Sequence, residues 1–333
     1  MRRAPAFWQA PTPTFFARAL SPVAAIWGAV AARRMDRDGA DVGVPVICIG
    51  NFTAGGAGKT PTAIAIAHLL IEAGRRPFFL TRGYGGRLGV DAVGHGAERD
   101  TATDVGDEPL LLARHAPVIV ARDRVAGARA AVAAGADVIV MDDGLQNPAL
   151  RKSFSLAVVD GSAGIGNGLC LPAGPLRAPM QAQWPRVSAV LVIGPGAAGE
   201  RFAREAEARK VPVLRGELVP DPAAAARLAG AHVVAFAGIG RPEKFYASLR
   251  ALGADVIETR DFPDHYPFTT ADLSGLTALA RARDAVLVTT EKDAARMGTS
   301  AWDALACRKD VLPVSVRVEG DGLRNLVLSH AHP

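Results

Sequence analysis

The segment Gly50-Asn51-Phe52-Thr53-Ala54-Gly55-Gly56-Ala57-Gly58-Lys59-Thr60-Pro61 decides the fold. It follows a β-branched apolar run at Val44–Ile49 and precedes a helical pattern at Lys59–Ala73 that stops before Gly74. Glycines let backbone N–H groups surround phosphate oxygens, and the start of the helix adds its positive dipole. A strand, a glycine-rich loop, Lys-Thr and a helix in this order predict a phosphate-binding loop (P-loop).

Within this loop, Lys59 is in the position that reaches the β- and γ-phosphates of a nucleotide, and the Thr60 hydroxyl can ligate Mg²⁺. The strict pattern has glycine where this chain has Thr53, and we expect the doubled glycine that follows to compensate. Pro61 is tolerated because the first helical turn needs no N–H there. The predicted nucleotide-binding residues are Thr53, Gly55, Gly56, Ala57, Gly58, Lys59 and Thr60.

The 333 residues suggest two domains, and short β-branched runs alternate with helical stretches, which is typical of a parallel sheet covered by helices. We predict an α/β fold: a P-loop NTPase-like domain with a parallel sheet, and a second, smaller α/β domain joined to it by a two-stranded linker. The stretch from Gly194 to Lys210 is rich in glycine, alanine and charged residues and is interpreted as a linker. The predicted division is an N-terminal helical region at 1–37, a P-loop domain at 38–210, linker strands at 211–220 and 311–319, and the smaller domain at 221–310.

A second motif, which is acidic, follows the apolar run Val138–Met141: Asp142-Asp143-Gly144. Carboxylates at the end of a strand organise the metal in P-loop enzymes, although Asp-Gly also forms turns. P-loop proteins include kinases, switches and partner-moving ATPases, so the fold alone does not give the reaction. Thr290-Glu291-Lys292-Asp293 differs from a guanine-reading motif, and Ala54 stands where partitioning ATPases carry a second lysine, so a small-molecule kinase is favoured.

Composition and charge say less about function than these motifs do. The three cysteines are far apart and predict neither disulfides nor a CxxC metal site. The net charge of +5 comes without an aromatic-basic module, so no nucleic-acid binding is expected.

Arginines flank an apolar run at Ala19–Ala32, which is short for a membrane span. Arg33-Arg34 stands where a signal peptide would be cleaved, so an interfacial membrane helix or a core-packing helix remain the alternatives.

Several short sequence motifs, in order along almost the whole chain, resemble those of the tetraacyldisaccharide 4'-kinase family. Besides the P-loop they are Thr81–Gly86, Gly106–Pro109, Asp142–Gln146, Gly166–Gly168 with Leu171–Arg177, Ala237–Gly240, Asp264-His265 and Thr290–Ala294. The resemblance implies transfer of the γ-phosphate of ATP to the 4'-hydroxyl of tetraacyldisaccharide 1-phosphate in lipid A biosynthesis. It also implies Mg²⁺ as cofactor and a peripheral location on the cytoplasmic face of the bacterial inner membrane, with no obligate protein partner evident.

Site roles follow from the same resemblance. Asp107 matches the family's proposed general base, His265 from the second domain would orient the hydroxyl, and Lys59 would complete the catalytic set. The implied metal ligands are Thr60, Glu108, Asp142 and Asp143. The candidates for the sugar and the 1-phosphate are Arg82, Tyr84, Arg124, Asn167 and Arg177.

From the residues alone, several of these assignments stay open. Asp107 stands in Asp-Glu-Pro, which is also a good helix start, and an isolated His265 is more often a structural loop residue. Arg124 is equally consistent with a solvated charge at a helix start. The alternatives to a lipid kinase are a membrane-associated ATPase switch, which would hydrolyse ATP without a lipid acceptor, and a kinase for a soluble sugar or nucleoside.

Overall fold

The computed structural model describes residues 5–84, 86, 93–95 and 102–332. Its larger sheet contains β1 (Val46–Gly50), β2 (Pro77–Thr81), β3 (Val93–His95), β4 (Val118–Val120), β5 (Val138–Asp142), β6 (Phe154–Asp160), β7 (Ala189–Ile193), β8 (Val213–Pro220) and β13 (Val314–Val318). The strand order is β13-β8-β7-β6-β1-β5-β2-β4-β3. Neighbouring strands are parallel, except that β3 and β13 run antiparallel to β4 and β8.

Helices cover both faces of this sheet, which explains why its central strands are continuous apolar runs. Ile47 and Ile49 share a cluster with α2 and α13, whereas Val46 and Cys48 on the opposite face pack with α5, and α7 covers β6 and β7. The helices of this part are η1 (Ala6–Trp8), α1 (Phe15–Met35), α2 (Lys59–Glu72), α3 (Ala102–Val105), α4 (Asp107–Leu112), α5 (Arg124–Ala133), α6 (Met180–Gln183), η2 (Trp184–Arg186), α7 (Ala197–Ala208) and α13 (Gly322–Ser329).

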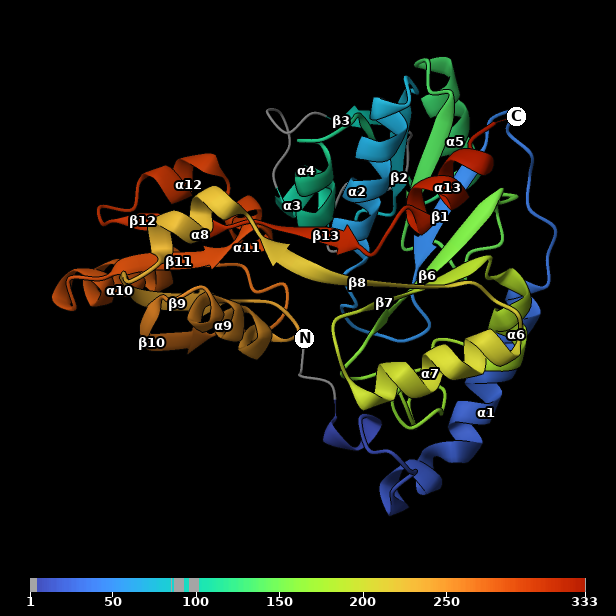
Figure 1. Ribbon diagram of the computed structural model, residues 1–333, viewed down its shortest axis with the longest axis horizontal. Helices are drawn as coiled ribbons and strands as arrows, with labels where there is room; N and C mark the ends of the chain where they lie inside the picture. Colours follow the sequence, from blue (N-terminus) through green and yellow to red (C-terminus); the bar gives the residue numbers. More distant parts are fainter. Residues whose placement is uncertain (1–4, 85, 87–92, 96–101, 333) are drawn as a thin grey trace.

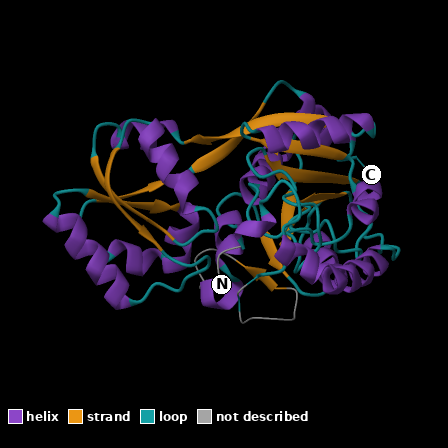
Figure 2. Ribbon diagram, turned by 90° about the horizontal axis from the view of Figure 1, so that it is seen from below, coloured by secondary structure: helices purple, strands orange, loops and turns teal. Residues whose placement is uncertain are grey.

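A smaller parallel sheet lies beside the larger one, and β8 and β13 run between the two parts (Figures 1 and 2). It consists of β9 (His232–Ala237), β10 (Asp255–Asp261), β11 (Val286–Thr290) and β12 (Lys309–Leu312), in the order β10-β9-β11-β12. Its helices are α8 (Pro222–Leu228), α9 (Pro242–Ala251), α10 (Thr270–Ala282), α11 (Glu291–Met297) and α12 (Thr299–Asp303).

The predicted fold class is confirmed: a mostly parallel α/β sheet carries the P-loop, and a smaller α/β unit accompanies it. The predicted pairing of the two connecting strands is also present, because β13 pairs antiparallel with β8 from Val314 opposite Pro220 to Val318 opposite Gly216. The motif Thr81–Gly86 includes Gly85, which lies outside the described residues.

The interpretation of 194–210 as a linker was wrong, because α7 occupies most of it. Phe202, Ala203 and Ala206 are buried against β6 and β7 at helical spacing, while charged residues occupy the other side. Glycines at 194 and 196 precede the helix, so the sequence shows no polar N-cap residue that would indicate where it starts.

The N-terminal helix is longer than the apolar run Ala19–Ala32, which was considered short for a membrane span. α1 spans 21 residues, and among the described residues it is the one helix long and apolar enough to cross a membrane by length and composition. Arg18 lies inside the helix and Arg33 and Arg34 in its last turn, so charged residues that were interpreted as flanks belong to the helix itself.

Candidate functional site

The P-loop joins the end of β1 to α2, and its backbone is held open by neighbouring residues. The Asn51 side chain donates to the Gly55 carbonyl at 3.0 Å, and Arg177 Nε donates to the Thr53 carbonyl at 3.0 Å. Gly58 precedes α2 with φ of +89°, and a Cβ there would lie 2.7 Å from Ile193 Cδ1. Only glycine fits that position without strain, so the Lys59-Thr60 pair is fixed at the start of α2.

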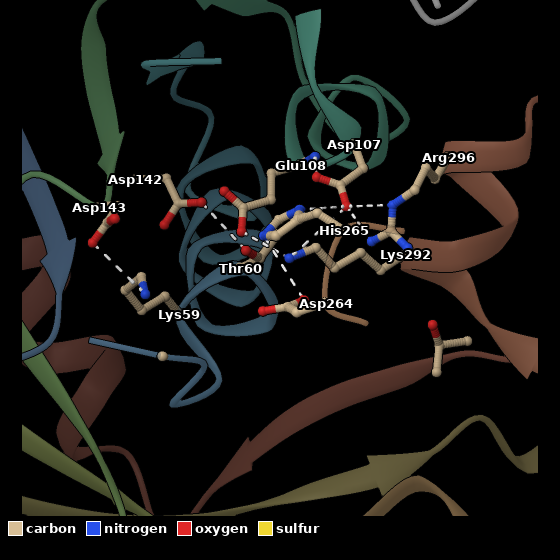
Figure 3. Close-up of polar contacts among 12 residues, drawn as sticks. Lys59, Thr60, Asp107, Glu108, Asp142, Asp143, Asp264, His265, Lys292 and Arg296 are labelled. Carbon is tan, nitrogen blue, oxygen red and sulfur yellow. Dashed lines mark hydrogen bonds and ion pairs between the residues drawn. The ribbon is translucent and has the colours of Figure 1, made fainter. Parts of the chain in front are cut away.

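Sheet register places the acidic motif beside this loop, because β5 is parallel to β1 and Asp142 pairs with Ile49. The Thr60 hydroxyl donates to Asp142 Oδ2 at 3.3 Å, and Lys59 Nζ lies 3.7 Å from Asp143 Oδ1 (Figure 3). Arg177 Nη1 donates to both oxygens of Asp143, at 2.8 and 3.0 Å. Lysine, hydroxyl and two carboxylates therefore converge at the carboxyl ends of β1 and β5.

The two neighbouring aspartates have opposite electrostatic environments. Burial, followed by the nearby Glu108 charge, raises the pKa of Asp142 to about 7. Burial alone would raise the pKa of Asp143 as well, but the charges of Lys59 and Arg177 outweigh it and lower the pKa to about 2. Asp142 Oδ1 is buried without a hydrogen-bond partner among the described residues. A buried carboxylate oxygen of this kind is suited to binding a cation.

A second constellation forms where α4 meets the smaller unit. Asp107 is 3% exposed, and its Oδ2 lies 3.2 Å from His265 Nδ1 (Figure 3). Burial alone would raise the pKa of Asp107, but the hydrogen bond with His265 and the charges of Lys292 and Arg296 hold it well below its usual range. Asp107 does not cap α4 through its side chain: Gly106 precedes the helix, and Asp107 Oδ1 accepts only from the next residue's N–H, at 3.0 Å, within the described part of the chain.

Two cations of α11 complete this constellation. Arg296 Nη2 donates to Asp107 Oδ2 at 2.5 Å. Lys292 Nζ donates to Glu108 Oε1 at 3.1 Å and lies 4.0 Å from Asp107 Oδ2. The acids of α4 are thus paired with His265, Lys292 and Arg296, all contributed by the smaller unit.

Comparison with known proteins gives the family. Residues 16–332 match the family model described as Tetraacyldisaccharide-1-P 4'-kinase. The chain belongs to this family. It is 58% identical to a tetraacyldisaccharide 4'-kinase of Methylobacterium sp. (strain 4-46), over 96% of this chain and 94% of that protein. It is 50% identical to one from Rhodopseudomonas palustris (strain BisB5), over 94% and 91% of the two chains.

A solved structure shares the fold. The chain resembles a crystal structure of LpxK from Aquifex aeolicus in complex with ATP, with a TM-score of 0.72 at 23% sequence identity. The likeness covers 96% of this chain and 100% of that one. Membership of the family makes the chain a kinase, and the solved structure shows that it shares the fold.

The sugar-binding candidates occupy different surroundings in this kinase. Tyr84 is 51% exposed, and its ring centroid lies 5.6 Å from that of His265. Arg82 is exposed on the same loop. Arg124 is buried at the start of α5, where Nη1 donates to the Ala121 carbonyl at 2.7 Å and burial lowers its pKa to about 10. It is therefore not the solvated charge considered above.

The other two candidates hold loops of the kinase. Asn167 Nδ2 donates to the carbonyls of Phe7 and Ala173, at 3.2 and 2.9 Å, and its Oδ1 accepts from Leu169 N–H at 3.1 Å. Arg177 connects the P-loop to Asp143, as described above. A role for either side chain in binding the sugar or the 1-phosphate stays a prediction.

Sequence reasoning missed part of this candidate site. Lys292 and Arg296 were given no role, although Lys292 stands in a matching motif. A second bridge was missed as well: Asp160, at the end of β6, accepts from Arg241 Nη1 at 2.7 Å and from Lys244 Nζ. Each pair joins segments that are 81 or more residues apart, so no local pattern could have indicated it.

Proposed function

We propose that this kinase transfers the γ-phosphate of ATP to the 4'-hydroxyl of tetraacyldisaccharide 1-phosphate, the reaction that its relatives' names describe. The observation that carries the proposal is the convergence of the P-loop with Asp107 and His265: Figure 3 draws the Lys59-Thr60 pair, the aspartates of β5 and the Asp107–His265 pair in one region. A nucleotide-phosphate site and a base candidate beside each other are what a phosphoryl-transfer enzyme requires.

We infer that Mg²⁺ binds with the nucleotide, held by Thr60, Asp142 and Glu108, with Asp143 beside them. The fit rests on Asp142 Oδ1, which has no hydrogen-bond partner among the described residues, and on the raised pKa of Asp142, since a cation would relieve the repulsion from Glu108. The described residues contain no cluster of three or more His, Cys, Asp or Glu side chains with metal-binding geometry. Mg²⁺ is usually held by one or two carboxylates together with substrate phosphates, which Asp142, Glu108 and a bound nucleotide would supply. When bound, the ion would supply positive charge that stabilises the negative charge of the transferred phosphoryl group.

We propose that Asp107 accepts the proton of the acceptor hydroxyl and that His265 orients the groups. Its low pKa makes Asp107 a weak base, which is sufficient when the proton leaves late in a loose transition state. Lys59 holds the nucleotide phosphates, so positioning and charge contribute more than base strength. Tyr84 stands next to His265 and is proposed, with Arg82 and Arg124, to contact the sugar or its phosphate.

We propose that α1 lies flat on the membrane surface and anchors the enzyme peripherally on the cytoplasmic face of the inner membrane. Its buried residues, Ala17, Ala24, Gly28 and Met35, recur at spacings of seven and four and so share one side of the helix. The exposed large apolar side chains Phe15, Phe16, Val23, Ile26, Trp27 and Val30 form a stripe on the opposite side. A helix docked on protein by one face and apolar on the other suits an interfacial position better than a span, although its length permits a span.

The proposed domain division places the smaller unit at 221–310, with β8 and β13 as the connection to the P-loop domain. Polar contacts between Asp107 and α11 and between Asp160 and α9 cross the boundary. We propose that these contacts adjust when the acceptor enters between the two units.

Replacing Asp107 tests the role assigned to it. Asp107→Ala is expected to lower kcat by roughly 10²–10⁴-fold, the usual contribution of a positioned acid or base, while the KM for ATP changes by less than about threefold. The measurement is steady-state phosphate transfer to the lipid in detergent micelles. A near-normal kcat would remove Asp107 from the mechanism.

A further inference from the structure

Arg296, in α11 of the smaller unit, donates hydrogen bonds to Asp107 in α4. Besides the 2.5 Å bond from Nη2, its Nε donates to the same oxygen, Asp107 Oδ2, at 3.2 Å. The Arg296 side chain is 7% exposed, so this charged pair is almost fully removed from water. A buried guanidinium with two N–H groups on one carboxylate oxygen fixes geometry as well as charge.

The Arg296 guanidinium also has hydrogen-bond partners within the smaller unit. Arg296 Nη1 donates to Asp293 Oδ1 at 2.5 Å and to the Gly238 carbonyl at 3.1 Å. Asp293 is fully buried, and its Oδ2 accepts from Gly238 N–H at 3.0 Å and from the Thr290 hydroxyl at 2.8 Å. These contacts fix Arg296 to β11, α11 and the β9 loop independently of Asp107.

These contacts give the two carboxylate oxygens of Asp107 different surroundings. Oδ2 contacts both Arg296 and His265, whereas Oδ1 accepts only the Glu108 N–H among the described contacts. A carboxylate oxygen has two lone-pair sites, so Oδ1 retains one for an incoming hydroxyl. The orientation of Asp107 is thus set by the smaller unit and not by α4 alone.

We propose that Arg296 is a positioning residue of the phosphoryl transfer, holding Asp107 Oδ2 so that Oδ1 is the oxygen that receives the acceptor proton. As the bond from the acceptor oxygen to the γ-phosphorus forms, the bond to the β–γ bridging oxygen breaks and its electron pair leaves on ADP. The hydroxyl proton passes to Asp107 Oδ1. The inference rests on the proposed role of Asp107 as base and adds the residue that orients it.

A double-mutant cycle tests the inference, with kcat measured for Arg296→Gln, Asp107→Asn and the double variant. Arg296→Gln is expected to lower kcat roughly 10²-fold, the cost of about 1 Å of misplacement, with the KM for ATP changed less than about threefold. In the Asp107→Asn background the same substitution is expected to lower kcat less than about threefold, because the group it orients is already inactive. Arg308→Gln, which removes an exposed arginine of the same unit paired with Asp284, is the matched control.

Folding is monitored by urea unfolding of each variant, and Arg296→Lys, which keeps the charge but not the fork, is expected to recover only part of the lost kcat. If Arg296→Gln is too unstable to assay, Arg296→Lys replaces it in the cycle. If the kcat losses of the two single variants multiply in the double variant, Arg296 does not act through Asp107 and the positioning role is overturned. A loss of kcat that is fully explained by the fraction of unfolded protein would overturn it as well. An active Asp107→Asn enzyme would instead overturn the base assignment itself, so the two failures are distinguishable.

Discussion

Removing the apolar face of α1 should release the enzyme from membranes. Phe16 and Trp27 are 70% and 52% exposed on that face. Fully burying a large apolar side chain is worth about 1.5–3 kcal/mol, so the exposed parts of these two together contribute about 2–4 kcal/mol to partitioning. Because 1.4 kcal/mol is a factor of ten, the double variant Phe16→Ser/Trp27→Ser should bind vesicles about 30- to 700-fold more weakly.

The assay is co-sedimentation with vesicles containing anionic lipid, with the bound fraction measured against lipid concentration. The matched control replaces two apolar residues exposed elsewhere, Leu218→Ser/Ile257→Ser, at 41% and 39% exposure. Both proteins should unfold at similar urea concentrations, since none of the four side chains is buried in the core. Equal binding by the two double variants would show that the face of α1 is not the membrane contact.

Three further predictions follow from the polar contacts. Burial and the Glu108 charge raise the pKa of Asp142 to about 7, so without metal or nucleotide the folded protein is expected to hold a proton that the unfolded chain releases. The unfolding free energy should therefore fall as pH rises from the ordinary aspartate pKa to about 7. Asp142→Asn should therefore raise the unfolding free energy by roughly 2–4 kcal/mol at pH 8 and little at pH 4 in urea titrations with EDTA, and equal changes at both pH values would contradict this. Asp160→Asn leaves Arg241 and Lys244 without their carboxylate and should lower the unfolding free energy by about 1–3 kcal/mol, given that both cations are partly exposed; an unchanged urea midpoint would argue against the bridge. Lys59→Ala should abolish ATP-dependent transfer while leaving the urea midpoint within about 1 M of the parent protein's, and turnover above a tenth of the parent's would contradict the phosphate-binding role.

The ATP side of the site was predictable because it depends on local order. Strand, glycines, Lys59 and helix follow one another within 30 residues, and parallel strands bring Asp142 to the same edge of the sheet. The apolar runs at Val44–Ile49 and Val138–Met141 correspond to β1 and β5 with ends that agree within two residues, because buried runs rich in β-branched residues leave little conformational freedom. These are features in which local propensity and fold agree.

The remainder depends on contacts between distant segments. Asp107 and Arg296 are 189 residues apart, and nothing in the sequence around either predicts their pairing. α7 was misread because glycines and charges resemble a linker, although the buried side chains at 202, 203 and 206 carry the helical period. The true length of α1 was missed because Arg18 was interpreted as a boundary, whereas a long arginine side chain can extend to water from within a helix.

The most direct test of the account is transfer of labelled γ-phosphate from Mg·ATP to tetraacyldisaccharide 1-phosphate in detergent micelles, with the Lys59→Ala protein as control. The account predicts lipid-linked label that is lost in the control. Free labelled phosphate with unlabelled lipid would contradict it and indicate an ATPase instead.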